Sequence, residues 1–238
     1  MYFAAEKGYK NVVNALIDKG ADVHAEDKNG KTPLHLAIFK NKENVVELLS
    51  QKGAKVDATI PLYGAIQYYS TGIVKALIDG GVDVNAKDEQ GYTPLHWAIF
   101  ENKKDVVKLL LKAEKIEVNE KDEQGETPLY WAILRDRKDI VELLLEAENI
   151  NVNAKDKDEN TPLHRAILEN KKDIVELLLK AENIDVNEKD NDENTPLHLA
   201  ILKNKKDVVT LLLEAENIDV IALLIIVGTN HKKAESTA

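Results

Sequence analysis

Two acidic segments of the chain come closest to a chemical site, because their residue spacing is close to that of a calcium-binding loop. The pattern Asp-x-Asp-x-Asn occurs at residues 156–160 and again at residues 190–194. A calcium loop of the EF-hand type also needs glycine at its sixth position and a bidentate glutamate at its twelfth. In the first copy those positions hold Thr161 and Ile167. We therefore expect no calcium binding and interpret both segments as solvated turns.

Histidine is the other residue type that could bind a metal or transfer protons. Four of the six histidines occupy one position of a recurring motif, namely His35, His96, His164 and His198. Tyrosine fills that position at Tyr63 and Tyr130, so the position is predicted to serve hydrogen bonding and packing. The chain has no cysteine, and we find no glycine-rich phosphate loop or nucleophile elbow. The sequence therefore predicts a protein that is not an enzyme and has no cofactor and no metal.

The recurring motif also defines the elements that carry these residues. All six prolines precede leucine in the pattern Pro-Leu-His/Tyr-x-Ala-Ile; they are Pro33, Pro61, Pro94, Pro128, Pro162 and Pro196. Proline is well suited to the first position of a helix, where its missing N–H has no partner in any case. Threonine, a good N-cap residue, precedes five of the six prolines. The pattern predicts six helix starts, the last four spaced by 34 residues.

One repeat can be followed from residue 127 to residue 156. A first helix is expected from Pro128 to about Arg135, because apolar residues recur there at helical spacing. A second helix opens near Asp139 and carries a broad apolar face. Asn149 is expected to end it in the left-handed conformation that asparagine tolerates. Each repeat is thus a turn followed by two antiparallel helices.

These motifs strongly resemble the ankyrin repeat. The resemblance rests on Thr-Pro-Leu-His-x-Ala at residues 32–37, 93–98, 161–166 and 195–200, Val-Val-Glu-Leu-Leu at 45–49 and Gly-Ala-Asp-Val at 20–23. It implies an all-α solenoid, a curved stack of about seven repeats, each a β-turn plus two antiparallel helices. It also implies that hairpins and first helices line a concave face that binds a partner protein. We expect one array over residues 1–220, with a partial first repeat at 1–30 and a shortened third repeat at 59–91.

Three repeats depart from the common pattern. The spacing from Pro33 to Pro61 is only 28 residues, and the third repeat carries Gly64 and Gly72, which lower helix preference. We expect it to be the weakest repeat. Glu159 and Glu193 stand where other hairpins have glycine. Because glycine adopts positive φ most readily, these two turns are expected to differ in geometry from the rest.

A row of large side chains follows the first helices, at the positions that the ankyrin resemblance places on the concave side. Residues three apart share a helix face, and tryptophan, tyrosine and arginine are frequent in binding hot spots. The residues predicted to bind a partner are Phe39, Tyr92, Trp97, Phe100, Trp131, Leu134, Arg135, Arg165 and Leu168. The alternative is that this row only packs one first helix against the next.

Charge is also arranged by repeat. Basic pairs lie between the helices of a repeat, at residues 103–104, 137–138, 171–172 and 205–206. The hairpins carry acidic pairs, for example at residues 88–89 and 122–123. The net charge of −10 and the pI near 5.2 argue against nucleic acid as a partner. The two charged edges either keep the protein soluble or steer a basic partner segment towards it.

The C-terminal end leaves the repeat pattern. Residues 221–227 are entirely apolar and a polar tail follows. This segment could cap the last repeat or mediate self-association, which would make the protein a structural spacer. The longest apolar run, residues 220–227, is too short to span a membrane, and the N-terminus lacks the apolar stretch of a signal peptide. We expect a soluble, cytoplasmic protein. The abundance of Lys, Asn and Ile leaves open a targeting fragment of a larger, host-directed bacterial protein delivered into a host cell.

Overall fold

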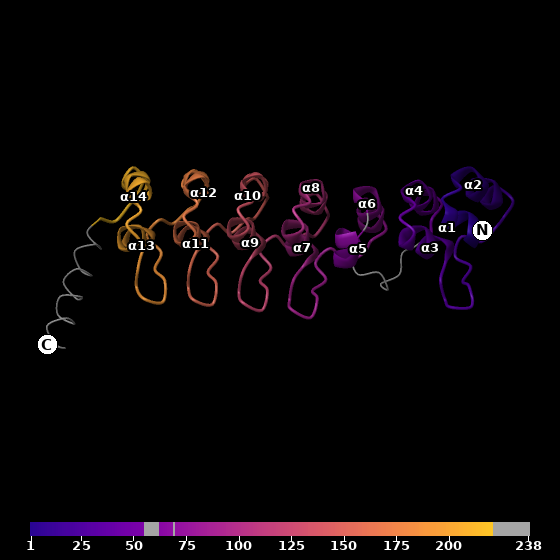
Figure 1. Ribbon diagram of the computed structural model, residues 1–238, viewed down its shortest axis with the longest axis horizontal. Coiled ribbons are helices and arrows are strands. Elements are labelled where there is room, and N and C mark those ends of the chain that lie inside the picture. Colours follow the sequence, from indigo (N-terminus) through magenta and orange to yellow (C-terminus); the bar gives the residue numbers. More distant parts are fainter. Residues whose placement is uncertain (55–61, 69, 221–238) are drawn as a thin grey trace. The chain divides into compact units, whose positions relative to one another are not determined.

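A computed structural model describes residues 1–54, 62–68 and 70–220, which form fourteen helices and no strand (Figure 1). The chain divides into two compact units, Met1–Glu117 (unit 1) and Val118–Ala238 (unit 2). The helices of unit 1 are α1 (Tyr2–Lys7), α2 (Lys10–Asp18), α3 (Pro33–Phe39), α4 (Glu43–Gln51), α5 (Leu62–Tyr68), α6 (Thr71–Asp79), α7 (Pro94–Phe100) and α8 (Lys104–Leu111). Those of unit 2 are α9 (Pro128–Leu134), α10 (Lys138–Leu145), α11 (Pro162–Leu168), α12 (Lys172–Leu178), α13 (Pro196–Leu202) and α14 (Lys206–Leu213).

The helices are arranged in two layers within each unit. Each odd-numbered helix, the first helix of its repeat, packs against the even-numbered second helix that follows. In unit 2 the first helices α9, α11 and α13 also pack side by side, as do the second helices α10, α12 and α14. The hairpin loops leave from the first-helix side, away from the second helices (Figure 1). Aliphatic side chains such as Leu95, Ile99, Val106 and Leu110 are fully buried between the layers.

The motif Thr-Pro-Leu-His/Tyr builds the start of five of the first helices. Helices α3, α7, α9, α11 and α13 all begin at the motif proline, with threonine as N-cap. Where histidine is present, its Nδ1 accepts a hydrogen bond from the threonine N–H, while the threonine side chain accepts one from the histidine N–H. Five of the six predicted helix starts are therefore confirmed, and the sixth, at Pro61, lies outside the described residues.

An aspartate closes each described hairpin. Asp156 accepts hydrogen bonds at Oδ1 from the backbone N–H groups of Asp158 and Asn160, both at 2.9 Å. Asp27, Asp88, Asp122 and Asp190 do the same in their own hairpins. At Asp27 these backbone hydrogen bonds lower the pKa of the carboxyl group. The first aspartate of each calcium-like pattern thus has a structural role within its turn.

The expectation that two hairpins differ in geometry is wrong. Glu159 and Glu193 adopt φ of 60° and 63°, in the same left-handed region as Gly91 at 79° and Gly125 at 80°. The hairpin hydrogen bond from residue 159 to Asp156 is also kept, at 3.2 Å. Each glutamate forms an ion pair with the lysine four residues before it in the chain. A residue with a Cβ therefore takes the glycine conformation because the aspartate-closed hairpin determines it. By contrast, the left-handed conformation expected for Asn149 is confirmed, with φ of 60°, although α10 itself ends earlier, at Leu145.

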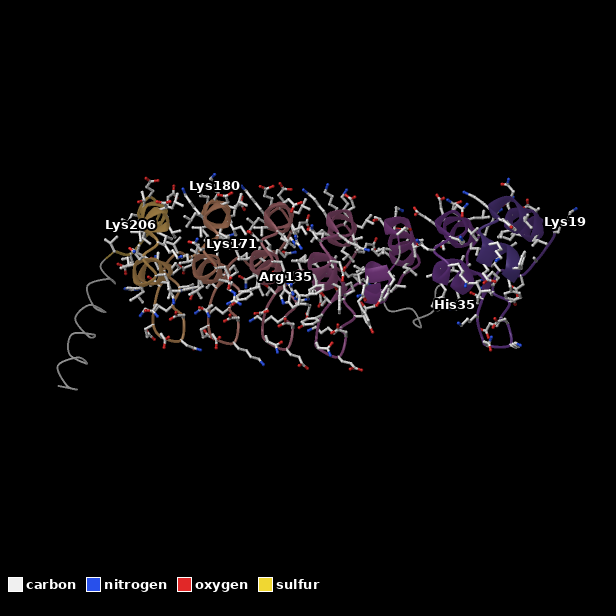
Figure 2. All side chains as sticks on the ribbon, viewed as in Figure 1. Lys19, His35, Arg135, Lys171, Lys180 and Lys206 are labelled. Atoms are coloured by element: carbon white, nitrogen blue, oxygen red, sulfur yellow. The ribbon has the colours of Figure 1, made fainter. Side chains whose placement is uncertain are left out.

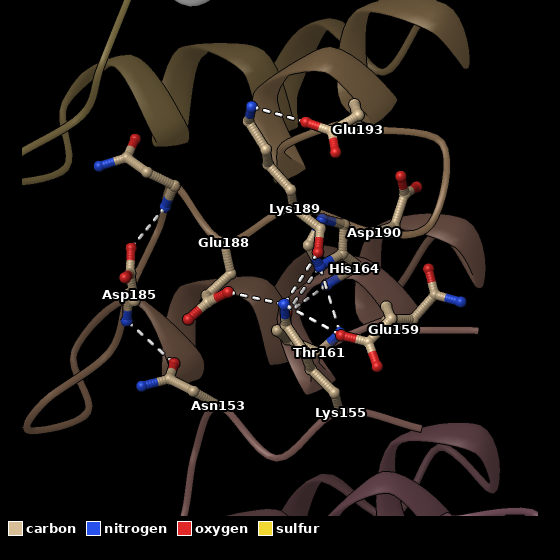
Figure 3. Close-up of polar contacts among 12 residues, drawn as sticks. Asn153, Lys155, Glu159, Thr161, His164, Asp185, Glu188, Lys189, Asp190 and Glu193 are labelled. Atoms are coloured by element: carbon tan, nitrogen blue, oxygen red, sulfur yellow. Dashed lines mark hydrogen bonds and ion pairs between the residues drawn. The ribbon is translucent and has the colours of Figure 1, made fainter. Parts of the chain in front are cut away.

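Asparagine side chains join successive repeats. Asn153 donates through Nδ2 to the carbonyl oxygen of Asn183, one repeat further on (2.7 Å). It also accepts at Oδ1 from the N–H of Asp185 in the same repeat (2.9 Å; Figure 3). Asn119 and Asn187 make the same pair of bonds within unit 2, and Asn85 does so within unit 1. We call these four residues the asparagine ladder.

Lysine forms a parallel connection between the hairpins of unit 2. The Nζ of Lys121 donates to the carbonyl oxygen of Lys155 at 2.7 Å, and the Nζ of Lys155 donates to that of Lys189 at 3.0 Å. Lys155 also forms an ion pair with Glu188 at 2.8 Å (Figure 3). That hydrogen-bonded contact raises the pKa of Lys155. The hairpins of unit 2 are therefore held to one another as well as to their helices.

Two predictions about the array stay predictions. The weakness of the third repeat depends in part on residues 55–61, which lie outside the described residues. The apolar segment 221–227 also lies outside them.

Candidate binding surface

In unit 1, three aromatic side chains gather around Trp97. Its ring stacks on Tyr63 of the preceding first helix, with centroids 6.3 Å apart and planes inclined by 27°. Tyr92 and Phe100 approach it edge-on, at 6.3 Å and 5.6 Å. We call Tyr63, Tyr92, Trp97 and Phe100 the aromatic cluster. Such edge-on and offset arrangements are the favourable geometries for aromatic pairs.

The hairpin fixes the central ring of this cluster. The indole Nε1 of Trp97 donates to Oδ2 of Asp88 at 2.7 Å. The other oxygen of Asp88 already accepts from the N–H groups of Gln90 and Tyr92. One carboxylate therefore ties the turn to the side chain of α7, and the tryptophan has a fixed orientation before any partner binds.

The aromatic cluster keeps part of its surface in solvent. Phe100 is 39% exposed, and Tyr92 and Trp97 are half-buried. Phe39, on α3, is 45% exposed and has the Nζ of Lys31 at 4.6 Å from its ring centre. The structure thus brings three of the predicted residues of unit 1 together, while Phe39 lies in a separate contact.

Unit 2 repeats the hydrogen bond of the tryptophan in a different environment. The indole Nε1 of Trp131 donates to Oδ2 of Asp122 at 2.9 Å, but Trp131 is only 8% exposed. The guanidinium of Arg135 lies 5.6 Å from its ring centre, a cation–π distance, and Arg135 is exposed beside α9 (Figure 2). Trp131 and Arg135, both members of the predicted row, are therefore in contact, with the arginine and not the tryptophan at the surface.

A charged network lies next to this pair. Arg165 is placed over the ring of Tyr130 at 5.0 Å and lies 3.9 Å from Glu126. The Tyr130 hydroxyl donates to Oδ2 of Asp156 in the next hairpin. Burial, and then the negative charge of Asp122, raise the pKa of Glu126. Burial together with the hydrogen bond to Asp156 raises the pKa of Tyr130, so this hydroxyl remains protonated.

The remaining predicted residues of unit 2, Leu134 and Leu168, are half-buried at the ends of α9 and α11. Sequence reasoning missed the residues that orient the predicted ones, which are Tyr63, Asp88, Asp122, Glu126 and Tyr130. One signal was present, since the aspartate and the tryptophan are nine residues apart in both cases. The orientation of the two tryptophans in the predicted row thus depends on hairpin aspartates that the prediction did not include.

The charged edges have a partly structural role in unit 2. Lys171 pairs with Asp136 at 2.9 Å, and Lys138 pairs with Asp173 at 3.3 Å, each linking neighbouring repeats. The first aspartate of each acidic pair closes its hairpin. The remaining hairpin acids, such as the exposed Glu123, are those available to solvent.

The motif histidines serve as capping residues. In His164, Nδ1 accepts from the Thr161 N–H at 3.2 Å, so the ring proton lies on Nε2, which faces the carbonyl oxygen of Asn194 at 3.0 Å. Burial lowers the pKa of His164 and keeps the ring neutral. Over residues 1–54, 62–68 and 70–220, histidine, aspartate and glutamate form no group of three that could hold a metal ion.

Comparison with known proteins agrees with this architecture. The family model described as ankyrin repeats (3 copies) matches residues 1–60, 62–156 and 148–222. The chain belongs to the ankyrin-repeat family. Its repeats pack in the way that the Thr-Pro-Leu-His motif indicates, as an ankyrin solenoid.

Individual relatives share the repeats over part of their length. Neurogenic locus notch homolog protein 1 of Xenopus laevis is 34% identical over 118 residues, and notch homolog protein 2 of Homo sapiens is 35% identical over 118 residues. Each match covers 47% of this chain, and the chain spans only 5% of the length of either relative. The crystal structure of the ankyrin-repeat domain of Bcl-3, a member of the IkappaB protein family, matches with a TM-score of 0.68 and 27% identity, covering 89% of this chain and 96% of that one.

Family membership carries a general functional statement. Ankyrin repeats form a protein–protein interaction scaffold, and that fold is typically not enzymatic. In the described part of the chain, no helix is long and apolar enough to cross a membrane.

Proposed function

We propose that this ankyrin-repeat protein is a non-enzymatic module that binds a partner protein through the first-helix side of its repeats. The observation that carries the proposal is the aromatic cluster of unit 1. It combines a tryptophan held by a carboxylate with a neighbouring phenylalanine that is 39% exposed. A surface fixed in this way loses little side-chain entropy when a partner binds, which favours affinity.

Energetics also support a binding role for this side. Phe39 and Phe100 leave large apolar side chains in water, and burying such area is worth about 25 cal/mol per Å². In unit 2 the exposed Arg135, with the half-buried Arg165, Leu134 and Leu168, offers cationic and apolar groups of the kind enriched in interfaces. The exposed hairpin acids would attract a partner with basic residues, so the association rate should fall as salt is added.

A site-specific crosslinking experiment tests this proposal. A photoreactive phenylalanine analogue replaces Phe100 and, in the matched control, Tyr68, which is 73% exposed on α5 but outside the aromatic cluster. Crosslinked proteins are then compared by mass spectrometry. The proposal requires a partner that crosslinks from position 100, and excess unmodified protein added before irradiation must prevent this crosslinking while a Tyr92→Ala/Phe100→Ala variant does not. Equal capture from positions 68 and 100 would refute it.

The last repeat favours a second candidate, self-association of the chain as a structural element. Ile99, Ile133 and Ile167 are fully buried, whereas Ile201, which lies 34 residues after Ile167, is 47% exposed. Leu202 and Leu213 are also exposed on this repeat. Sedimentation velocity should then show concentration-dependent association that Ile201→Lys/Leu202→Lys abolishes. A monomer at every concentration would exclude this candidate.

A further inference from the structure

The second-helix side of unit 2 contains two grooves that the proposed function does not use. The first lies between the C-terminal ends of α10 and α12 and has a volume of about 720 Å³. The second lies between those of α12 and α14 and has a volume of about 770 Å³. Half-buried aliphatic side chains line them, including Leu145 and Leu177 in the first and Leu179 and Leu211 in the second.

The two grooves are copies in the same register. Each residue lining the second lies 34 positions after its counterpart in the first, as for Leu145 and Leu179. Residues 180–183 line both grooves. A ligand that crosses α12 therefore meets the same surface twice without leaving the chain.

The rims of both grooves are strongly acidic. Four carboxylates and one ammonium group, that of Lys180, line each groove. The carboxylates are Glu142, Glu146, Glu148 and Glu182 in the first groove and Glu176, Glu182, Glu214 and Glu216 in the second. Lys172 lies within 3.9 Å of one of them, Glu176. Lys180, just after α12, projects on the second-helix side, whereas Arg135 lies beside the first helix α9 (Figure 2).

The fold does not require this acidic excess. The corresponding groove of unit 1, between α6 and α8, has a similar volume of about 740 Å³ but carries three acidic and three basic side chains. One pair of these, Lys75 and Asp79, already forms an ion pair. Five of the seven rim glutamates, all but Glu142 and Glu176, also follow the C-termini of their helices, as Glu146 follows α10, where negative charge opposes the helix dipole. Helix stability therefore gives no reason for these five.

We infer that the paired grooves of unit 2 form a second binding surface for a lysine- or arginine-rich segment of a partner protein, with one apolar side chain for each groove. The apolar floor and acidic rim complement this composition. Packed helices lie roughly 8–10 Å apart, and an extended chain advances about 3.3 Å per residue. An apolar residue at every third position, with basic residues between, therefore matches the spacing of the grooves.

A fluorescent peptide of repeating Lys-Lys-Leu provides the probe, and its Lys-Lys-Ser counterpart tests the role of the apolar residue. Glu182, shared by both grooves, is changed to lysine, and the matched control is Glu114→Lys at the corresponding position of the unit 1 groove. Both variants change the net charge equally. Glu182→Lys should weaken binding of the Lys-Lys-Leu peptide roughly tenfold or more, as charge complementarity affects association, while Glu114→Lys should leave it near wild type.

Equal losses in the two variants would mean attraction to net charge alone and would overturn the inference, as would equal affinity for the two peptides. A second pair of variants fills a groove without changing its charge, and so tests binding inside the groove separately from attraction to its rim. Ala181 lines both unit 2 grooves, and Ala113 lines the groove of unit 1. Ala181→Trp should abolish peptide binding and Ala113→Trp should not. Thermal melts confirm folding of each variant. Tyr92→Ala/Phe100→Ala should leave peptide binding unchanged, so the outcome is independent of the function proposed above.

Discussion

Trp97 of unit 1 and Trp131 of unit 2 share a motif and a hydrogen bond but differ in environment. Each indole donates to an aspartate nine residues earlier, at 2.7 Å for Trp97 and 2.9 Å for Trp131. Trp97 is half-buried among three aromatic rings, whereas Trp131 is 8% exposed. The aspartate–tryptophan hydrogen bond is therefore a common feature of the two repeats, whereas the neighbouring side chains determine how much of the indole ring is exposed to solvent.

The largest expected effect is on stability in unit 2. Trp131→Ala removes a buried ring and should lower the free energy of unfolding by about 3–5 kcal/mol, measured by urea denaturation. Trp97→Ala should lower it by clearly less, since its ring is partly solvated already. Equal losses in the free energy of unfolding for the two variants would show that the difference in exposure between the two rings does not affect stability.

The hairpin carboxylates give the next largest effect. In Asp122→Asn the amide oxygen can still accept from the two backbone N–H groups, but an NH₂ donor then faces the indole of Trp131. The buried, unpaired donor should destabilise the protein by about 1–3 kcal/mol. Asp88→Asn should be milder because Asp88 is more exposed than Asp122, which is 7% exposed. Chemical denaturation of both variants tests the order, and a larger loss for Asp88→Asn would contradict it.

Phe100 should separate binding from stability. Phe100→Ala removes an edge-on contact with Trp97 worth about 1 kcal/mol or less, so its melting temperature should stay close to that of the wild type. Partner capture should nevertheless be lost. Tyr68→Ala, at an exposed aromatic residue outside the aromatic cluster, is the matched control and should keep capture. Retained capture by Phe100→Ala would move the site away from the aromatic cluster.

The smallest effect concerns pH. Glu126 occupies the position of Tyr92 one repeat earlier, and burial raises its pKa. The folded state therefore binds the Glu126 carboxyl proton more tightly than the unfolded state does. Protonation of Glu126 thus stabilises the fold at low pH, and this stabilisation is lost as the pH rises through the raised pKa. Glu126→Gln should remove this loss and melt slightly higher than wild type near neutral pH, with the advantage shrinking as the solution is acidified. Glu123→Gln, an exposed hairpin residue, serves as the control and should show no such trend.

Much of the fold could be predicted because local chemistry determines it. Threonine followed by proline determines where a first helix starts whatever lies around it, and asparagine at residue 149 indicates a left-handed residue, although α10 ends before it, at Leu145. The hairpin prediction failed at Glu159 because glycine preference was weighed without the aspartate that closes the turn. The asparagine ladder was missed, although Val-Asn-x-Lys-Asp recurs, because its bonds join residues 30 and 32 positions apart.

The proposed binding surface was harder to predict for a related reason. The row of first-helix positions follows from helical spacing, so Tyr92, Trp97 and Phe100 could be proposed as neighbours. The exposure of each ring depends instead on side chains contributed by other repeats, such as Tyr63 beside Trp97. Sequence spacing within one repeat contains no information about those contacts, which is why Trp131 was predicted to be as available as Trp97.

The asparagine ladder has a consequence for how such a chain can grow. The side chain of each ladder residue bonds to the backbone of the next repeat, at fixed offsets of 30 and 32 residues. A duplicated 34-residue segment would therefore arrive with its own connection and find the acceptor it needs already in place. The chain can therefore gain or lose whole repeats while the remaining asparagine hydrogen bonds are kept. An insertion of a few residues between an asparagine and its acceptor would instead break the hydrogen bonds of that one repeat and leave the others intact.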